Sequence, residues 1–131
     1  MMALMQFDLV SPERKLASME ASAVQIPGAE GDLTAMPEHA PFMTVLRPGV
    51  LTVDSPSGTQ EFVVTGGFAE ISPEGTSVLA EQAVAKADAT REMLDGALEA
   101  AKAAAESATE DTAVIAAKRV NDFSDLIARL F

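Results

Sequence analysis

The chain contains no cysteine, tryptophan or tyrosine, and its single histidine is His39. The absence of cysteine excludes disulfide bonds, thiol catalysis and cysteine-ligated metal centres. One histidine is also too few for the ligand cluster that a protein metal site normally needs. His39 has two interpretations, a general base or metal ligand and a loop histidine that hydrogen-bonds its own corner. We favour the second and expect no metal centre.

Basic residues are scarce, with nine Lys and Arg against twenty Asp and Glu, which gives a net charge of −11. The deficit holds in both parts of the chain: three basic against ten acidic residues in 1–80, and six against ten in 81–131. Neither part offers the basic face that a phosphate backbone or an anionic lipid surface requires. We therefore exclude nucleic acid as a partner and expect contacts with proteins instead.

Long hydrophobic runs are also absent, because no apolar stretch approaches the ~18 residues of a membrane-spanning helix. The start, Met1–Val10, has no basic residue before its apolar positions and contains Asp8, so we do not expect a secretory signal. No Gly-x-Ser-x-Gly elbow is present, and Gly66-Gly67 lacks the spacing of a phosphate-binding loop. These absences predict a non-catalytic protein that reaches a membrane only through other subunits.

Turn signals divide the first part of the chain at short intervals. Pro27-Gly28, Pro48-Gly49, Asp54–Gly58 and Ser72–Gly75 are typical turn sequences, and apolar residues alternate between them. Many short strands separated in this way favour a sandwich or barrel. We predict a β-sandwich or flattened barrel of about ten short strands over residues 1–82. The expected strands are 3–10, 15–19, 21–26 (with Glu20 as the break before it), 33–36, 42–46, 50–53, 60–65, 68–71 (resuming the previous strand after a break or bulge at Gly66-Gly67) and 76–80.

The composition changes after Glu81, because proline disappears and alanine, the strongest helix former, becomes dominant. We predict an antiparallel two-helix hairpin over residues 86–131, with its first helix capped by Asp88 and its second helix over 112–130, capped by Thr109 or Asp111. The expected apolar faces are Leu94, Ala97, Leu98, Ala101 and Ala105 on the first helix and Ala113, Ala116, Ala117, Val120, Phe123, Ile127 and Leu130 on the second. Alanine buries little area, so we expect a marginal hairpin that docks on the sandwich and is able to leave it.

Three motifs lie within residues 31–49: Gly31-Asp32-Leu33, Pro37-Glu38-His39-Ala40-Pro41 and Leu46-Arg47-Pro48-Gly49. Together they resemble the signature of the epsilon subunit of F-type ATP synthases, in which Glu38 stands at a position usually held by glycine. Phe62-Val63-Val64, Gly66-Gly67-Phe68, Glu70 and Val78-Leu79-Ala80-Glu81 follow in matching order. The resemblance spans the whole chain and is strongest over the first eighty residues.

The resemblance implies a non-catalytic subunit of the central rotor stalk, which couples proton flow to ATP synthesis at the cytoplasmic face of the bacterial inner membrane. The implied partners are the gamma subunit, the ring of membrane c subunits and, through the C-terminal helices, the catalytic alpha and beta subunits. No cofactor is implied beyond ATP as a regulatory ligand. The implied contact residues for the ring and stalk are Glu30, Asp32, His39 and Arg47, with Asp32 paired to a basic residue of the ring.

Two groups of charged residues in the predicted hairpin each have two interpretations. Asp88 and Arg91 form either a helix cap with an ion pair or part of a nucleotide site known in some family members, although Ala87 and Glu92 depart from that motif. Lys118, Arg119 and Arg129 are either contacts to the catalytic head or a solvated face. The alternative to a stalk subunit is a free-standing, nucleotide-sensing β-sandwich.

Overall fold

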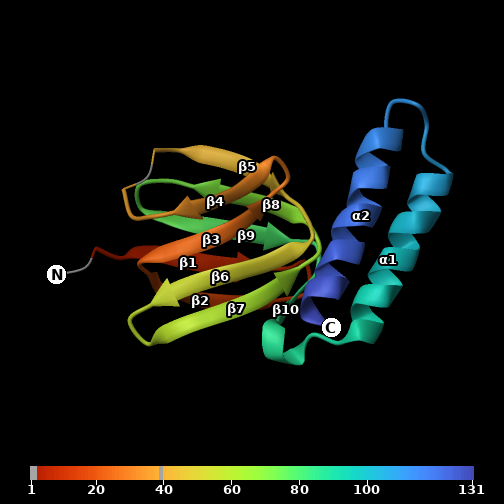
Figure 1. Cartoon of the computed structure of the whole chain (residues 1–131). Helices are drawn as coiled ribbons and strands as arrows, with labels where there is room; N and C mark the ends of the chain where they lie inside the picture. Colours follow the sequence, from red (N-terminus) through yellow and green to blue (C-terminus); the bar gives the residue numbers. More distant parts are fainter. Residues whose placement is uncertain (1–2, 39) are drawn as a thin grey trace. The chain divides into compact units, whose positions relative to one another are not determined.

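In the computed structural model, which describes residues 3–38 and 40–131, ten strands are followed by two α-helices (Figure 1). The chain divides between Ala87 and Asp88 into a β unit and a helical unit. The strands are β1 (Met5–Val10), β2 (Lys15–Ala21), β3 (Ala23–Gly28), β4 (Gly31–Ala35), β5 (Phe42–Leu46), β6 (Gly49–Ser55), β7 (Gly58–Val64), β8 (Gly67–Ile71), β9 (Gly75–Ala80) and β10 (Ala83–Ala85). The expectation of a β-sandwich followed by two helices is confirmed.

The strands form one sheet in the order β10-β7-β6-β3-β5-β8-β9-β1-β2, with β4 paired to β3. All neighbouring strands are antiparallel except β1 and β9, which are parallel. The path passes from β3 to β5 through one residue pair, Gly28 opposite Leu46. Strand β2, at one end of the path, contacts β6 near the other end. The sheet therefore curls back on itself into a nearly closed sandwich.

The interior of the sandwich is filled by alternate residues of its strands. On β1, Met5, Phe7 and Leu9 are buried while their neighbours are exposed or half-buried, and Val24 and Ile26 on β3 face the same core. Burying a side chain of this size contributes about 1.5–3 kcal/mol. The core consists of aliphatic side chains and two phenylalanines, as a sequence without tryptophan or tyrosine requires.

Two details of the predicted strands are wrong. Glu20 lies inside β2, on its exposed side, and the break falls at Ser22, whose amide and hydroxyl both donate to the Asp54 carbonyl. A charged residue on the solvent face does not end a strand. Strands β7 and β8 have different neighbours, so Gly66-Gly67 joins two strands and does not interrupt one. At Gly67, φ is +127° and an added Cβ would lie 2.0 Å from the Leu79 carbonyl oxygen, so only glycine fits.

Strand β10 was not predicted. It extends the sheet past residue 82, the predicted end of the sandwich. Its residues Ala83–Ala85 pair with Phe62–Val64 of β7. A three-residue strand that contains two alanines has no strand signal of its own, because alanine favours helix. Long-range pairing with β7 determines its conformation.

A short 3-10 helix, η1 (Lys86–Asp88), spans the division between the units, and the helical unit contains α1 (Arg91–Glu106) and α2 (Ala113–Leu130). The predicted caps are wrong. Thr90 caps α1, because its hydroxyl accepts a hydrogen bond of 3.1 Å from the Met93 amide, whereas Asp88 lies in η1. Helix α2 follows Thr112, whose hydroxyl accepts from the Thr109 amide and does not cap the helix. A threonine directly before the helix is closer to the free amides of the first turn than an aspartate two residues earlier.

The two helices run antiparallel and pack against each other (Figure 1). The predicted stripe on α1 is confirmed, with Leu94 and Ala101 buried and the other members half-buried. On α2, Phe123 and Ile127 are buried as expected, but Leu126 is buried too, while Ala113 and Ala117 are exposed, which corrects the predicted face. The face is wider than predicted because positions three and four residues after Phe123 both belong to it. Neither helix of the described chain is long and apolar enough to span a membrane.

Candidate functional site

The turn between β3 and β4 forms a corner of the sandwich that is anchored to the neighbouring strand. Pro27 pairs with Asp32 and Gly28 with Gly31, which leaves Ala29 and Glu30 at the tip. The Ala29 amide donates to the Val45 carbonyl at 2.7 Å. The Arg47 amide donates to the carbonyl of Pro27 at 2.9 Å. The backbone of the turn is therefore attached to β5 and to the residue that follows it.

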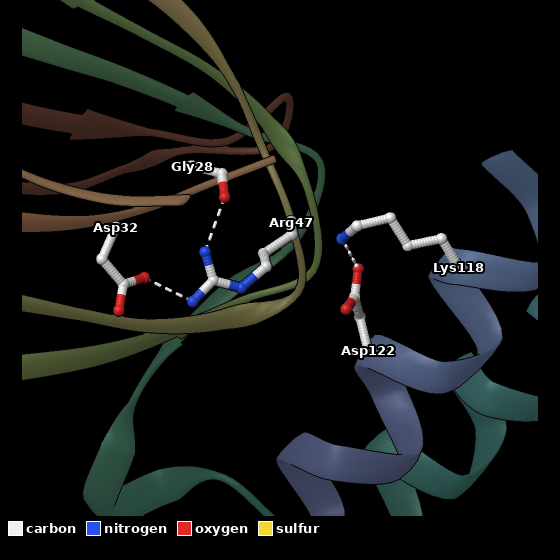
Figure 2. A network of polar contacts seen from close by, with 5 residues as sticks. All are labelled: Gly28, Asp32, Arg47, Lys118 and Asp122. Carbon is white, nitrogen blue, oxygen red and sulfur yellow. Dashed lines mark hydrogen bonds and ion pairs between the residues drawn. The ribbon is translucent and has the colours of Figure 1, made fainter. Parts of the chain in front are cut away.

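Arg47 adds a side-chain connection to the same turn. Its Nη1 donates to the Gly28 carbonyl at 2.6 Å, and its Nη2 binds the Asp32 carboxylate, as Figure 2 shows. The Arg47 side chain is only 22% exposed, whereas that of Asp32 is 76% exposed. Gly28 leaves no room for a side chain, because an added Cβ would lie 2.5 Å from the Gly31 carbonyl oxygen. Three predicted contact residues, Glu30, Asp32 and Arg47, thus share one corner, which we call the Arg47 corner (residues 28–32 and 47).

The segment after β4 contains an unusual backbone conformation. Glu38 has a φ of +65°, in the left-handed region, and its amide donates to the Pro73 carbonyl at 3.1 Å. Glycine tolerates this region without a steric penalty. The glycine that the resemblance leads us to expect at this position would adopt the conformation without strain. His39, the next residue, lies outside the described residues, so its predicted role stays a prediction.

The outer face of the sheet carries a row of large apolar side chains that no sequence motif marks. Val45 on β5 lies opposite Phe68 on β8, which lies opposite Leu79 on β9. These side chains are 52%, 52% and 55% exposed, and Met43 on the same face of β5 is 63% exposed. We call these four residues the apolar row. Exposed apolar patches are typical of sites that bind a protein, a membrane or a ligand. Its only sequence signal was that apolar residues occupy both faces of residues 42–46.

The charged residues predicted near the start of the hairpin lie apart in the structure. Arg91, the first residue of α1, pairs with Asp95 through its Nε at 3.8 Å. Asp88 lies in η1, before the Thr90 cap, so the predicted helical pair of Asp88 with Arg91 does not form. A pair three residues apart needs both residues on one helix. The assignment of Asp88 and Arg91 to a nucleotide site stays a prediction.

Two of the three predicted cations on α2 interact with residues of the same helix. Lys118 Nζ lies 2.8 Å from the Asp122 carboxylate, one turn further on (Figure 2). The Arg119 guanidinium lies over the Phe123 ring, 5.1 Å from its centroid. Arg129 lies exposed in the last turn. Whether these residues contact a catalytic head stays a prediction.

A polar cluster on β1 and β2 is the remaining charged group of note. Asp8 has a pKa below its usual range, first because the Ser18 hydroxyl hydrogen-bonds to it and then because Lys15 and Gln6 do. Lys15 Nζ lies 3.2 Å from Asp8 Oδ1. Within residues 3–38 and 40–131, no group of three His, Asp or Glu side chains has the arrangement of a metal site. The Asp8 cluster links β1 to β2 through side chains of both strands.

Comparison with known proteins identifies the fold and the family. Residues 4–86 match the family model described as ATP synthase, Delta/Epsilon chain, beta-sandwich domain. The ATP synthase epsilon chain of Ruegeria sp. (strain TM1040) is 63% identical over 82% of this chain and 78% of its own length. That of Rhodobacter capsulatus is 54% identical over 93% of this chain and 92% of its own length.

Two solved structures have the same architecture. A chain in the Euglena gracilis mitochondrial ATP synthase structure (OSCP/F1/c-ring, rotational state 1) has a TM-score of 0.72 and 26% identity, covering 98% of this chain and 82% of that one. A chain in the Tetrahymena thermophila mitochondrial ATP synthase central stalk/c-ring structure has a TM-score of 0.63 at 16% identity over 95% of this chain and 94% of that one, which supports the fold alone. From the family model and the relatives, we conclude that the chain belongs to the ATP synthase epsilon chain family.

Proposed function

We propose that this chain is the non-catalytic epsilon subunit of an F-type ATP synthase and forms part of the central rotor stalk that couples proton flow to ATP synthesis. Family membership over nearly the whole chain supports this proposal, as does the likeness to a chain from an F1/c-ring assembly. The structural observation that carries it is the apolar row, because large apolar side chains that lie exposed side by side on one sheet face form a surface that a protein partner would cover.

The two surfaces of the sandwich suit two different partners. The apolar row, with Phe68 at its centre, suits the gamma subunit, because covering each half-exposed side chain would contribute about 1 kcal/mol. The Arg47 corner is polar and rigidly held, which suits the polar loops of the c ring. In this arrangement the subunit is peripheral, at the cytoplasmic face of the bacterial inner membrane, and is held there by the stalk and the ring.

The helical unit serves as a regulatory element in this proposal. It is separate from the β unit in its internal packing, and alanine makes up half of the buried and half-buried residues on α1, which packs against α2. Such a contact contributes little per residue, so the unit is suited to change its conformation within the complex. Through α2 it would meet the catalytic alpha and beta subunits, with Lys118 and Arg129 as exposed cations.

The test is reconstitution of an ATP synthase from which the epsilon subunit has been removed. Adding back the full chain should restore proton-driven ATP synthesis and should co-purify with the gamma and c subunits. Adding back residues 1–87 should restore synthesis as well, with altered ATP hydrolysis. If the full chain did not associate with gamma and c, and the isolated chain bound ATP in calorimetry, the free-standing nucleotide-sensing alternative would replace this proposal.

A further inference from the structure

We propose that Arg47 is the positioning residue of the ring-facing corner, and that it engages Asp32 internally so that Glu30 is the carboxylate offered to the partner. The inference rests on the proposed function, because it assigns roles within the same contact surface. The three residues of the corner then have three different roles. Arg47 holds the turn, Asp32 is bound by Arg47, and Glu30 makes the contact with the partner.

The turn between β3 and β4 is attached to the neighbouring chain segment in two ways, by backbone bonds and by a side chain. The backbone bonds of Ala29 to Val45 and of Arg47 to Pro27 connect the turn to β5. They leave the Gly28 carbonyl and the Asp32 carboxylate on either side of the tip, and one guanidinium binds both of them. Arginine is suited to this role, because its planar group donates in fixed directions to two acceptors at once, which the single ammonium of lysine cannot reproduce.

The guanidinium of Arg47 lies mostly out of solvent. The Arg47 side chain is largely shielded, at 22% exposed, so its charge-assisted bonds are screened less than those of a surface pair. Its bond to the buried Gly28 carbonyl closes the base of the turn, and its bond to Asp32 closes the β4 side. Removing the guanidinium would leave the Gly28 carbonyl without this donor and would free both sides of the tip.

The charges of the corner are not equally available to a partner. Asp32 and Arg47 neutralise each other, so the pair offers little net charge to a partner. Glu30 is exposed at the tip and makes no ion pair among residues 3–38 and 40–131. The net negative charge of the corner is therefore located on Glu30. A partner that recognises this corner would present a basic side chain to that position.

The first experiment uses the isolated full chain and measures amide hydrogen exchange at Ala29, with the Ile71 amide of β8 as an internal reference for global unfolding. We expect Arg47→Ala to accelerate Ala29 exchange about tenfold or more, as loss of one charge-assisted bond would do. Arg47→Lys should give an intermediate rate, and Arg14→Ala, an arginine elsewhere on the sandwich, should leave the rate unchanged. An unchanged Ala29 rate in Arg47→Ala would overturn the role of Arg47.

The second experiment measures binding of the chain to a purified rotor of gamma and c subunits at several salt concentrations. Glu30→Gln should weaken binding about tenfold and flatten its salt dependence while leaving Ala29 exchange unchanged. Asp32→Asn should weaken rotor binding only in proportion to its acceleration of Ala29 exchange. In a chain that already carries Arg47→Ala, Asp32→Asn should cause no further loss of rotor binding.

Two results would contradict the division of roles. Weakened binding by Asp32→Asn with unchanged Ala29 exchange would show that Asp32 contacts the partner directly, which overturns the inference. A wild-type chain that did not bind the rotor would overturn the proposed function and the role of Glu30 with it. The exchange measurement on the isolated chain would still decide the role of Arg47, so the two failures are distinguishable.

Discussion

The amide of Glu38 donates to the carbonyl of Pro73, and this bond holds Glu38 in the left-handed region of backbone space. A residue with a Cβ adopts that conformation at a cost of about 1–2 kcal/mol, whereas glycine has no such cost but loses about 0.5–1 kcal/mol of chain entropy on folding. The bond to Pro73 therefore offsets the strain of the Glu38 backbone.

We accordingly expect Glu38→Gly to stabilise the chain by about 0.5–1 kcal/mol, measured by urea denaturation. The matched control is Glu13→Gly, at an exposed loop position where φ is negative, which should be neutral or destabilising. Equal effects of the two substitutions would contradict the explanation.

The apolar row makes a prediction about assembly. Phe68→Lys should reduce co-purification with gamma at least tenfold, because a charge at the centre of a buried contact is left without a partner. It should change the free energy of unfolding of the isolated chain by less than about 0.5 kcal/mol, since Phe68 is half-exposed. Gln25→Lys, on an exposed position of β3, serves as the control and should leave association intact. Retained association in Phe68→Lys would exclude this face as the contact.

The Asp8 cluster predicts a pH dependence of stability. The folded pKa of Asp8 is lowered, so its contribution is present above the unfolded value of about 3.9 and is lost as the pH falls through the folded value. Asp8→Asn should therefore destabilise the chain at pH 7 by a few tenths of a kcal/mol, the size typical of a surface pair. The difference from wild type should vanish near pH 2. A difference of the same size at both pH values would mean that the charge of Asp8 is not responsible.

Helix capping gives a prediction for the helical unit. Thr90→Ala should cost about 1 kcal/mol of stability and reduce the helical signal in circular dichroism, because the Met93 amide loses its acceptor. Asp88→Ala should have little effect, since Asp88 lies in η1. If Asp88→Ala reduced the stability and the helical signal more than Thr90→Ala, Asp88 would be the cap.

The sequence predicted local features well and long-range ones poorly. The bounds of β5 follow from the prolines that flank it, and the stripe of Leu94 and Ala101 follows from helical spacing. The structure reproduces both. The bonds of Arg47 to Gly28 and Asp32, which lie 19 and 15 residues away, depend on the crossing of β3 and β5, which no local pattern encodes. The apolar row was missed for the same reason, since Val45, Phe68 and Leu79 become neighbours only when three strands align in register.

The pairing of Gly28 with Leu46 has a mechanical consequence. It is the one residue pair, within the described strands, through which the sheet path crosses from β3 to β5, and it lies at the base of the turn that Arg47 holds. A force applied to that turn would enter the sandwich at this single pair, and it would pass to β6 through β3 and to β8 through β5.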